Sequence, residues 1–88
     1  MNSGNYIQTA SITFGGNCSA LVGSGTVNIS KTTTIPIVNA AAKTGIIIDN
    51  IEFNGSGLSN TIIDETSIID GTINDIQIYS GSAFGISV

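Results

Sequence analysis

Residues 46–57 read IIIDNIEFNGSG, in which three isoleucines lead into an alternating segment with a glycine-rich tail. When the chain is compared with itself, residues 48–53 (IDNIEF) match residues 73–78 (INDIQI), which lie 25 positions later. Every pair in this match joins residues that are identical, similar in shape or both apolar. The match indicates an internal repeat of about 25 residues, a length that is typical of solenoid proteins.

Other parts of the chain agree with this spacing. Residues 27–29 (VNI) fall under residues 51–53 (IEF) at a shift of 24, and Ile37, Ile62 and Ile86 follow one another at shifts of 25 and 24. Short runs of Ile, Val and Thr are separated by Gly, Asn, Ser and Asp, which is typical of strands joined by tight turns. No stretch of about ten or more residues has its apolar positions at helical spacing.

These patterns predict an all-β chain folded as a parallel β-helix of about three to four coils. The expected strands are residues 7–14, 26–29, 34–38, 45–48, 51–53, 61–64, 67–69, 73–79 and 85–88.

Each coil of such a fold places its strands about 4.8 Å from those of the coil before it, so that inward side chains stack in columns. The expected stacked pairs are Ile51 on Ile76, Phe53 on Ile78, and Ile62 on Ile86. Glu52 and Gln77 should face solvent. The alternative is a small antiparallel β-sandwich, which explains the short strands but leaves the repeat as a coincidence.

Composition excludes several classes of function. Only 9% of the 88 residues are charged, and two lysines against six carboxylates give a net charge of −4, so we expect no nucleic-acid partner. The longest apolar runs are three residues, far short of a membrane span, so we expect no membrane insertion. The chain has no histidine and a single cysteine, Cys18, which permits no internal disulfide. The sequence gives no indication of a metal site or a cofactor.

The sequence also resembles a known family. Residues 45–55 (GIIIDNIEFNG), 76–78 (IQI) and 85–88 (GISV) are similar to the right-handed parallel β-helix of pectate-lyase-like proteins. The low charge and the corners rich in Ser, Asn and Thr are most similar to bacteriophage tailspikes. The resemblance covers residues 20–88. It implies an N-terminal strand and lead-in segment over residues 1–20, and β-helix coils over residues 21–88.

The last residues, 85–88, look like the start of a strand, and no capping segment follows them. Because an uncapped coil exposes unpaired backbone groups, we expect the remainder of a longer chain or partner subunits to cover this end. Since tailspike-like proteins are homotrimers, the resemblance implies self-association as a homotrimer.

Candidate site residues are few. Asp49 and Asp75 are expected at corresponding corners of adjacent coils, where two carboxylates about 5 Å apart would suit a retaining glycosidase. Asp residues at such corners usually bond to the turn backbone, so these two are weak catalytic candidates. Tyr79 should point outward beside Gln77, Glu52 and Asn54, and this group is the candidate for glycan binding.

Taken with the resemblance, these features predict a structural and binding segment of a virion tailspike or fibre. It would act at the virion tail or outside the cell and contact a bacterial surface polysaccharide. One alternative is a fragment of a polysaccharide lyase or glycoside hydrolase, although we do not expect this chain alone to be an enzyme. Another is a structural subunit of an extracellular filament or adhesin.

Overall fold

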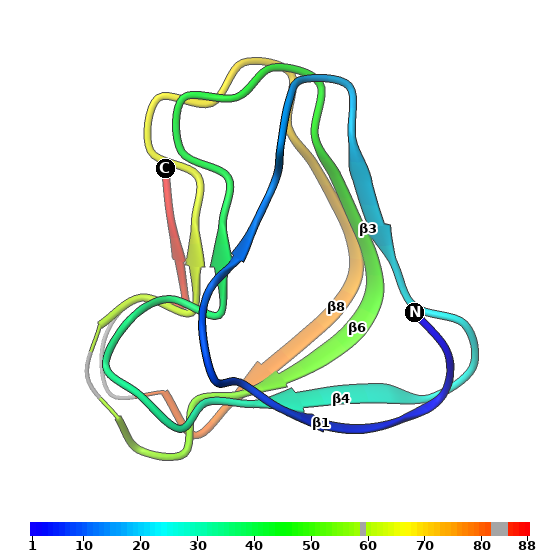
Figure 1. Ribbon diagram of the computed structural model, residues 1–88, viewed down its shortest axis with the longest axis vertical. Coiled ribbons are helices and arrows are strands. Elements are labelled where there is room, and N and C mark those ends of the chain that lie inside the picture. The colour runs from blue at the N-terminus through cyan, green and yellow to red at the C-terminus, as the bar shows by residue number, and fades with distance from the viewer. Residues whose placement is uncertain (59, 82–84) are drawn as a thin grey trace.

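The computed structural model describes residues 1–58, 60–81 and 85–88. In these residues the chain forms strands and turns, with no helix. It winds as a right-handed solenoid of about three turns with a roughly triangular cross-section (Figure 1). The strands are β1 (Gly4–Ile7), β2 (Ile12–Thr13), β3 (Ala20–Val22), β4 (Val27–Ser30), β5 (Val38–Asn39), β6 (Ile47–Asn54), β7 (Ile63–Asp64), β8 (Thr72–Tyr79) and β9 (Ile86–Ser87).

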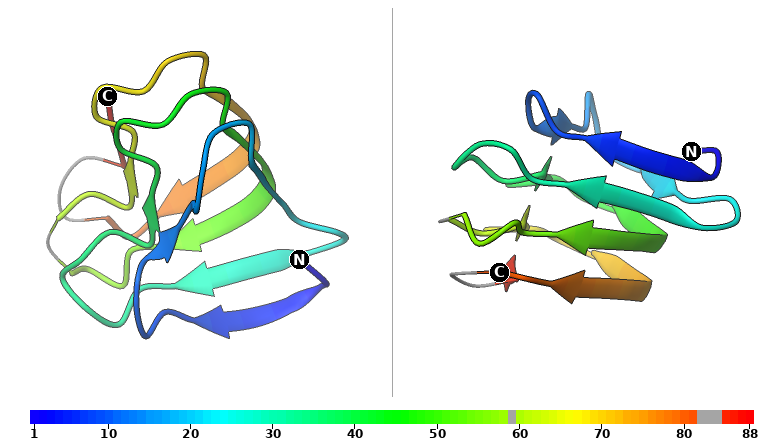
Figure 2. Two further views of the ribbon diagram at one scale, coloured as in Figure 1. Left: turned by 45° about the horizontal axis from the view of Figure 1, so that its top comes forward. Right: turned by 90° about the horizontal axis from the view of Figure 1, so that it is seen from below.

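Every strand pairing in the described part of the chain is parallel. One sheet runs β1, β4, β6 and β3, with β8 also paired to β6, and the second sheet runs β2, β5, β7 and β9. Figure 2 shows the coils stacked one on another along the solenoid axis. The parallel β-helix prediction is therefore confirmed, and the antiparallel sandwich is excluded.

The register between β6 and β8 is the one that the repeat predicts. Ile48 pairs with Ile73, Ile51 with Ile76, Glu52 with Gln77, and Phe53 with Ile78. The predicted alignment of residues 27–29 with residues 51–53, at a spacing of 24, is also confirmed. Asn28 pairs with Glu52, and Ile29 pairs with Phe53.

The predicted pairing of Ile62 with Ile86 is wrong by one residue. Ile63 pairs with Ile86, a spacing of 23 residues, whereas Val38 pairs with Ile63 at a spacing of 25. The amides of Ile62 and Ile63 both donate to the carbonyl of Gly85. Because the corners of successive coils differ in length, a constant spacing does not predict the register on every side.

Several strand boundaries also differ from the prediction. Residues 47–48 and 51–53 belong to the single strand β6, which bends at Asn50, whereas residues 45 and 46 precede it. β8 bends likewise at Asp75. Both bend residues have left-handed backbone angles, φ 56° and φ 49°, which Asn and Asp tolerate better than most residues. Residues 7–14 divide between β1 and β2, and residues 67–69 supply only the isolated bridge of Ile69 to Thr44. β3 was not predicted.

The core is a set of stacked inward side chains. Phe53, which has no exposed surface, lies between Ile29 and Ile78 in one column. Phe14 is also buried. The buried apolar residues are Phe14, Val27, Ile29, Ile37, Val38, Ala40, Ile46, Ile48, Ile51, Phe53, Ile62 and Ile63.

Three long polar side chains are buried as well. Gln8 donates to the Pro36 carbonyl at 2.7 Å, and the Lys31 ammonium donates to the Thr61 carbonyl at 3.1 Å. Burial lowers the pKa of Lys31 and raises the pKa of Glu65. Glu65 is only 4% exposed, and its Oε1 has no hydrogen-bond partner among the described residues. The bonds of Gln8 and Lys31 tie neighbouring corners of the coils together from inside.

Candidate functional site

The outward side chains of β4, β6 and β8 form two rows that run across the strands. The first row contains Asn28, Glu52 and Gln77, and the second contains Ser30, Asn54 and Tyr79. We call these six residues the polar face. They lie side by side because every second residue of a strand points to the same face of the sheet, and the parallel register places these positions next to one another on adjacent strands. The four residues chosen from sequence for glycan binding all belong to this face.

Tyr79 is the aromatic residue of the polar face, and 39% of it is exposed. Its hydroxyl accepts a hydrogen bond from Nδ2 of Asn28, which belongs to β4, so the side chain crosses β6 to reach that strand. Adjacent strands are about 4.8 Å apart, so the Tyr79 and Asn28 side chains together bridge about 10 Å of the surface. The contact holds the ring in one orientation across the face.

Asn28 was not identified from sequence, although the repeat places it in the same row as Glu52 and Gln77. It also accepts a hydrogen bond from the Ser30 hydroxyl at 3.3 Å. Asn54 has a local structural contact, because its Oδ1 accepts the backbone amide of Ser56 at 2.9 Å. The polar face therefore contains both residues that support Tyr79 and residues that shape the following turn.

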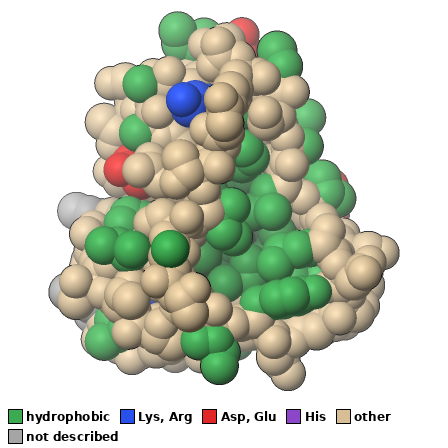
Figure 3. All heavy atoms as spheres, in the orientation of Figure 1, with side chains coloured by type: hydrophobic (Ala, Val, Ile, Leu, Met, Phe, Trp, Pro, Cys, Tyr) green, Lys and Arg blue, Asp and Glu red, His purple; other side chains and the backbone are tan. Residues whose placement is uncertain are grey.

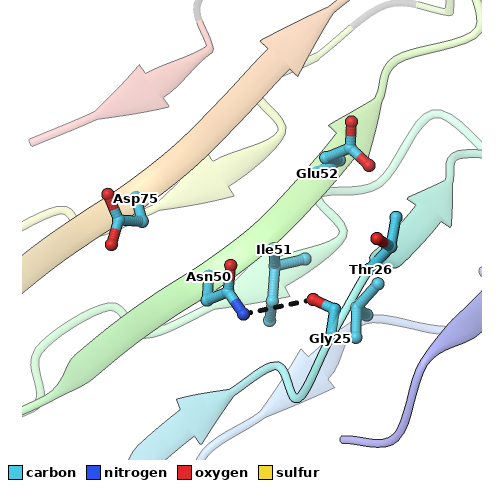
Figure 4. Close-up of a pocket in the computed structure, with 7 residues that line it drawn as sticks. Gly25, Thr26, Asn50, Ile51, Glu52 and Asp75 are labelled. Carbon is cyan, nitrogen blue, oxygen red and sulfur yellow. Dashed lines mark hydrogen bonds between the residues drawn. The ribbon is translucent and has the colours of Figure 1, made fainter.

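A hollow of about 260 Å³ adjoins the polar face where β6 and β8 bend (Figure 4). Glu52 and Asp75 contribute carboxylates to its wall, and the loop at Gly25 and Thr26 forms the opposite side. Since sites for drug-sized ligands occupy roughly 300 Å³ or more, this hollow suits a single small ring or one unit of a polymer.

Asn50 holds the loop side of this hollow in place. Its Nδ2 donates to the carbonyl of Gly23 at 3.0 Å and to that of Gly25 at 3.2 Å. In the first coil a loop joins β3 to β4, whereas in the next coil Asn50 alone makes the same bend within β6. Because the loop between β3 and β4 is longer than the bend at Asn50, it lies to one side of that bend, and the space between them is the hollow.

The two catalytic candidates do not occupy corresponding corners, and this part of the prediction is corrected. Asp49 pairs with Asn74, and Asp75 is one position further along β8, at the bend. Nδ2 of Asn74 donates to Oδ1 of Asp49 at 3.3 Å and to Oδ2 of Asp75 at 3.5 Å. Of the two, Asp75 alone lines the hollow, where the second carboxylate is that of Glu52.

Other kinds of site have little support. In the described part of the chain, no group of three or more His, Cys, Asp and Glu residues is arranged to hold a metal ion. Cys18 is exposed and has no disulfide partner. Across residues 1–58, 60–81 and 85–88, no helix has the length and apolar character needed to cross a bilayer.

Comparison of the chain with protein-family models, with curated proteins and with solved structures gives no match in any of the three. The fold and the geometry of the polar face therefore carry the functional argument.

Proposed function

We propose that this chain is a rigid β-solenoid segment that binds a polysaccharide through the polar face and the adjoining hollow. The observation that carries the proposal is the position of Tyr79, which lies across the strands with its hydroxyl bonded to Asn28. A fixed aromatic ring offers an apolar surface for one face of a sugar ring at little cost in side-chain entropy. Glu52 and Gln77 lie in the neighbouring row, where they can bond to sugar hydroxyls.

The arrangement suits a polymer better than a small molecule. The rows of the polar face run from β4 to β8, so that polar groups recur on three neighbouring strands. The hollow is large enough for one unit only, and the remainder of a chain would extend along the rows. A repeating ligand therefore matches a repeating surface.

The setting that we propose is a virion tailspike or fibre, at the virion tail or outside a cell, with a bacterial surface polysaccharide as the ligand. Support comes from the parallel solenoid, which is a stiff rod, and from a surface with few charges. Assembly as a homotrimer belongs to the same proposal. It would place one polar face on each subunit and strengthen binding through multivalency.

A panel of bacterial polysaccharides and oligosaccharides immobilised on an array tests the binding proposal with the full chain and three variants. Tyr79→Ala should weaken binding about tenfold or more, equivalent to about 1.4 kcal/mol. Tyr79→Phe keeps the ring and should stay within about threefold of wild type. Ile69→Ala, at an exposed isoleucine away from the polar face, is the matched control. Equal binding by wild type and Tyr79→Ala, or no binding to any glycan, would reject the proposal.

Glycan cleavage is a second candidate function, because Glu52 and Asp75 line the same hollow. Acid–base cleavage of a glycosidic bond needs two carboxylates facing one sugar linkage. If the chain cleaves a glycan that it binds, Glu52→Gln and Asp75→Asn should each abolish the release of reducing ends. Asp49→Asn, outside the hollow, should not. Release of product by both hollow variants would remove these carboxylates as catalysts.

A further inference from the structure

The hollow beside the polar face has two acidic side chains in its wall. Glu52 of β6 and Asp75 of β8 contribute the carboxylates, and Figure 4 shows that they come from neighbouring strands. The other residues that line the hollow carry no charge: Gly25, Thr26, Val27, Asn50 and Ile51. A ligand that enters the hollow therefore meets negative charge only.

The positive groups of the chain lie elsewhere. The chain contains two lysines and no arginine. Lys31 is 1% exposed, and its ammonium donates to the carbonyl of Thr61. Lys43 belongs to the corner that precedes β6, and the α-amino group of Met1 donates to the Val22 carbonyl at 2.6 Å. None of these three groups is among the described residues that line the hollow.

The rest of the surface does little to change the charge that a ligand meets there. Only 9% of the residues are charged, and charged side chains are few on the face that Figure 3 shows. Exposed charges more than about 8–10 Å away are largely screened at physiological ionic strength. Glu52 and Asp75 therefore dominate the electrostatics of the hollow.

Asp75 occupies a bend at which the preceding coils have uncharged residues. Gly25, Asn50 and Asp75 follow one another at intervals of 25 residues, and all three have left-handed backbone angles, φ 76°, 56° and 49°. Asn50 donates to the carbonyls of Gly23 and Gly25 in the coil before it. A carboxylate has no proton to donate, so Asp75 cannot make the corresponding bonds to β6. The bend does not require a negative charge, because the preceding coil makes it with an amide.

The charge of a sugar unit decides how well it fits this hollow. Any unit that fills the hollow takes the carboxylates partly out of water, which costs free energy unless the unit compensates for the lost hydration. The hydroxyls of an uncharged unit form weaker hydrogen bonds to a carboxylate than a cationic donor does. An acidic unit adds like-charge repulsion. An ammonium group offsets the negative charge and has three N–H donors to share between the two side chains.

We infer that the hollow holds a sugar unit with a free amino group, a specificity that rests on the proposed binding of a polysaccharide. Glu52 and Asp75 bond to the ammonium group of that unit, and polymers of acidic sugars are rejected. Tyr79 lies four residues after Asp75 on β8, about 13 Å along a strand, so a polymer of several units reaches both the ring and the hollow. The bound polysaccharide therefore contains positively charged amino sugars.

Chemical N-acetylation of the arrayed polysaccharides tests this specificity, because it removes the charge of every free amine. Binding of the full chain is measured before and after treatment with acetic anhydride, at about pH 6, where amines are protonated. The glycans that bind should carry free amines, and acetylation should weaken their binding at least about fivefold. Raising the salt concentration from about 0.05 M to about 0.5 M should weaken binding to the amine form and leave binding to the acetylated form unchanged.

The possible outcomes separate the specificity from the binding function. Binding that depends on Tyr79 but is unchanged by acetylation, or that is strongest for acidic glycans, would overturn the amino-sugar specificity and leave the proposed function standing. If no glycan binds in either form, both fail.

Variants assign the effect to the hollow. Glu52→Gln combined with Asp75→Asn removes both carboxylates at nearly constant shape, and Asp75→Asn restores the residue type that the bend has in the preceding coil. The ratio of binding between the amine and acetylated forms should fall to within about twofold of one. Asp49→Asn removes a carboxylate outside the hollow and, as the matched control, should keep the wild-type ratio. Circular dichroism checks the fold of each variant. A wild-type ratio in the double variant would contradict the proposal.

Discussion

Replacing Glu65 with glutamine should stabilise the fold at neutral pH. The Glu65 side chain is 4% exposed, and its Oε1 lacks a hydrogen-bond partner among the described residues. Burial raises the pKa of this carboxyl, because the surroundings disfavour the charged form. Glutamine has nearly the same shape and carries no charge, so the substitution removes the cost of burying a carboxylate without opening a cavity.

The sign of the pH dependence follows from the raised pKa. Below the ordinary carboxyl pKa of about 4.3, Glu65 is protonated in the folded and the unfolded state and causes no loss of stability. As the pH rises through the higher folded-state pKa, the folded state holds the proton more strongly than the unfolded state, and the free energy of unfolding falls. The wild type should therefore lose stability over this interval, and Glu65→Gln should not show that loss.

The expected gain at pH 7 is on the order of 1 kcal/mol, because each unit by which burial raises the pKa of Glu65 costs the folded state about 1.4 kcal/mol. In a chain of this size, each kcal/mol corresponds to a rise in melting temperature of about 4–8 °C.

Thermal unfolding followed by circular dichroism at pH 4 and pH 7 measures the effect. Glu52→Gln removes the same charge from the polar face and serves as the control, with an expected change within about 0.5 kcal/mol. The difference between wild type and Glu65→Gln should be clear at pH 7 and close to zero at pH 4. Equal stability at pH 7, or a difference that persists unchanged at pH 4, would show that a buried charge at Glu65 is not the cause.

Two further predictions concern the core and the bends. Phe53→Ala removes a fully buried ring and should lower the free energy of unfolding by about 3–5 kcal/mol in urea, whereas Ile47→Ala, at an exposed position, should cost less than about 1 kcal/mol. Similar costs for both would contradict the inward stacking of Phe53. Asn50→Ala loses the bonds to Gly23 and Gly25 and strains a left-handed backbone, so it should cost about 1–3 kcal/mol in a thermal melt. Asn50→Gly should cost less than Asn50→Ala, and the reverse order would exclude backbone strain as a cause.

The sequence predicts the fold where inward residues repeat at constant spacing. The isoleucines of β6 and β8 occur in the same register, because both strands have eight residues and a single bend. The prediction fails where corners vary in length, as between Ile63 and Ile86. β3 was missed because Ala20, Leu21 and Val22 pair with β6 at a spacing of 27 residues, outside the 24 to 25 of the repeat. Their pairing with β6 depends on tertiary contacts rather than on local preference.

The candidate site is predictable only in part, for similar reasons. Alternation along the strands places Glu52 and Gln77 on one face, as it does Asn54 and Tyr79. The bond from Asn28 to Tyr79 joins residues 51 positions apart, and no local pattern indicates it. The hollow depends on the position of the loop at Gly25 relative to the bend at Asn50, and this position is set only when the chain folds.

The most direct test of polysaccharide binding through the polar face is a titration of the ¹⁵N-labelled full chain, followed by NMR, with a glycan that it binds on the array. The proposal predicts that the largest amide shifts fall on residues 28–30, 52–54 and 77–79, with smaller changes around the hollow at residues 25 and 26. Amides of β5 and β7, on the other sheet, should remain unchanged. Shifts centred on β5 and β7, or none on the polar face when the glycan is saturating, would contradict the proposal.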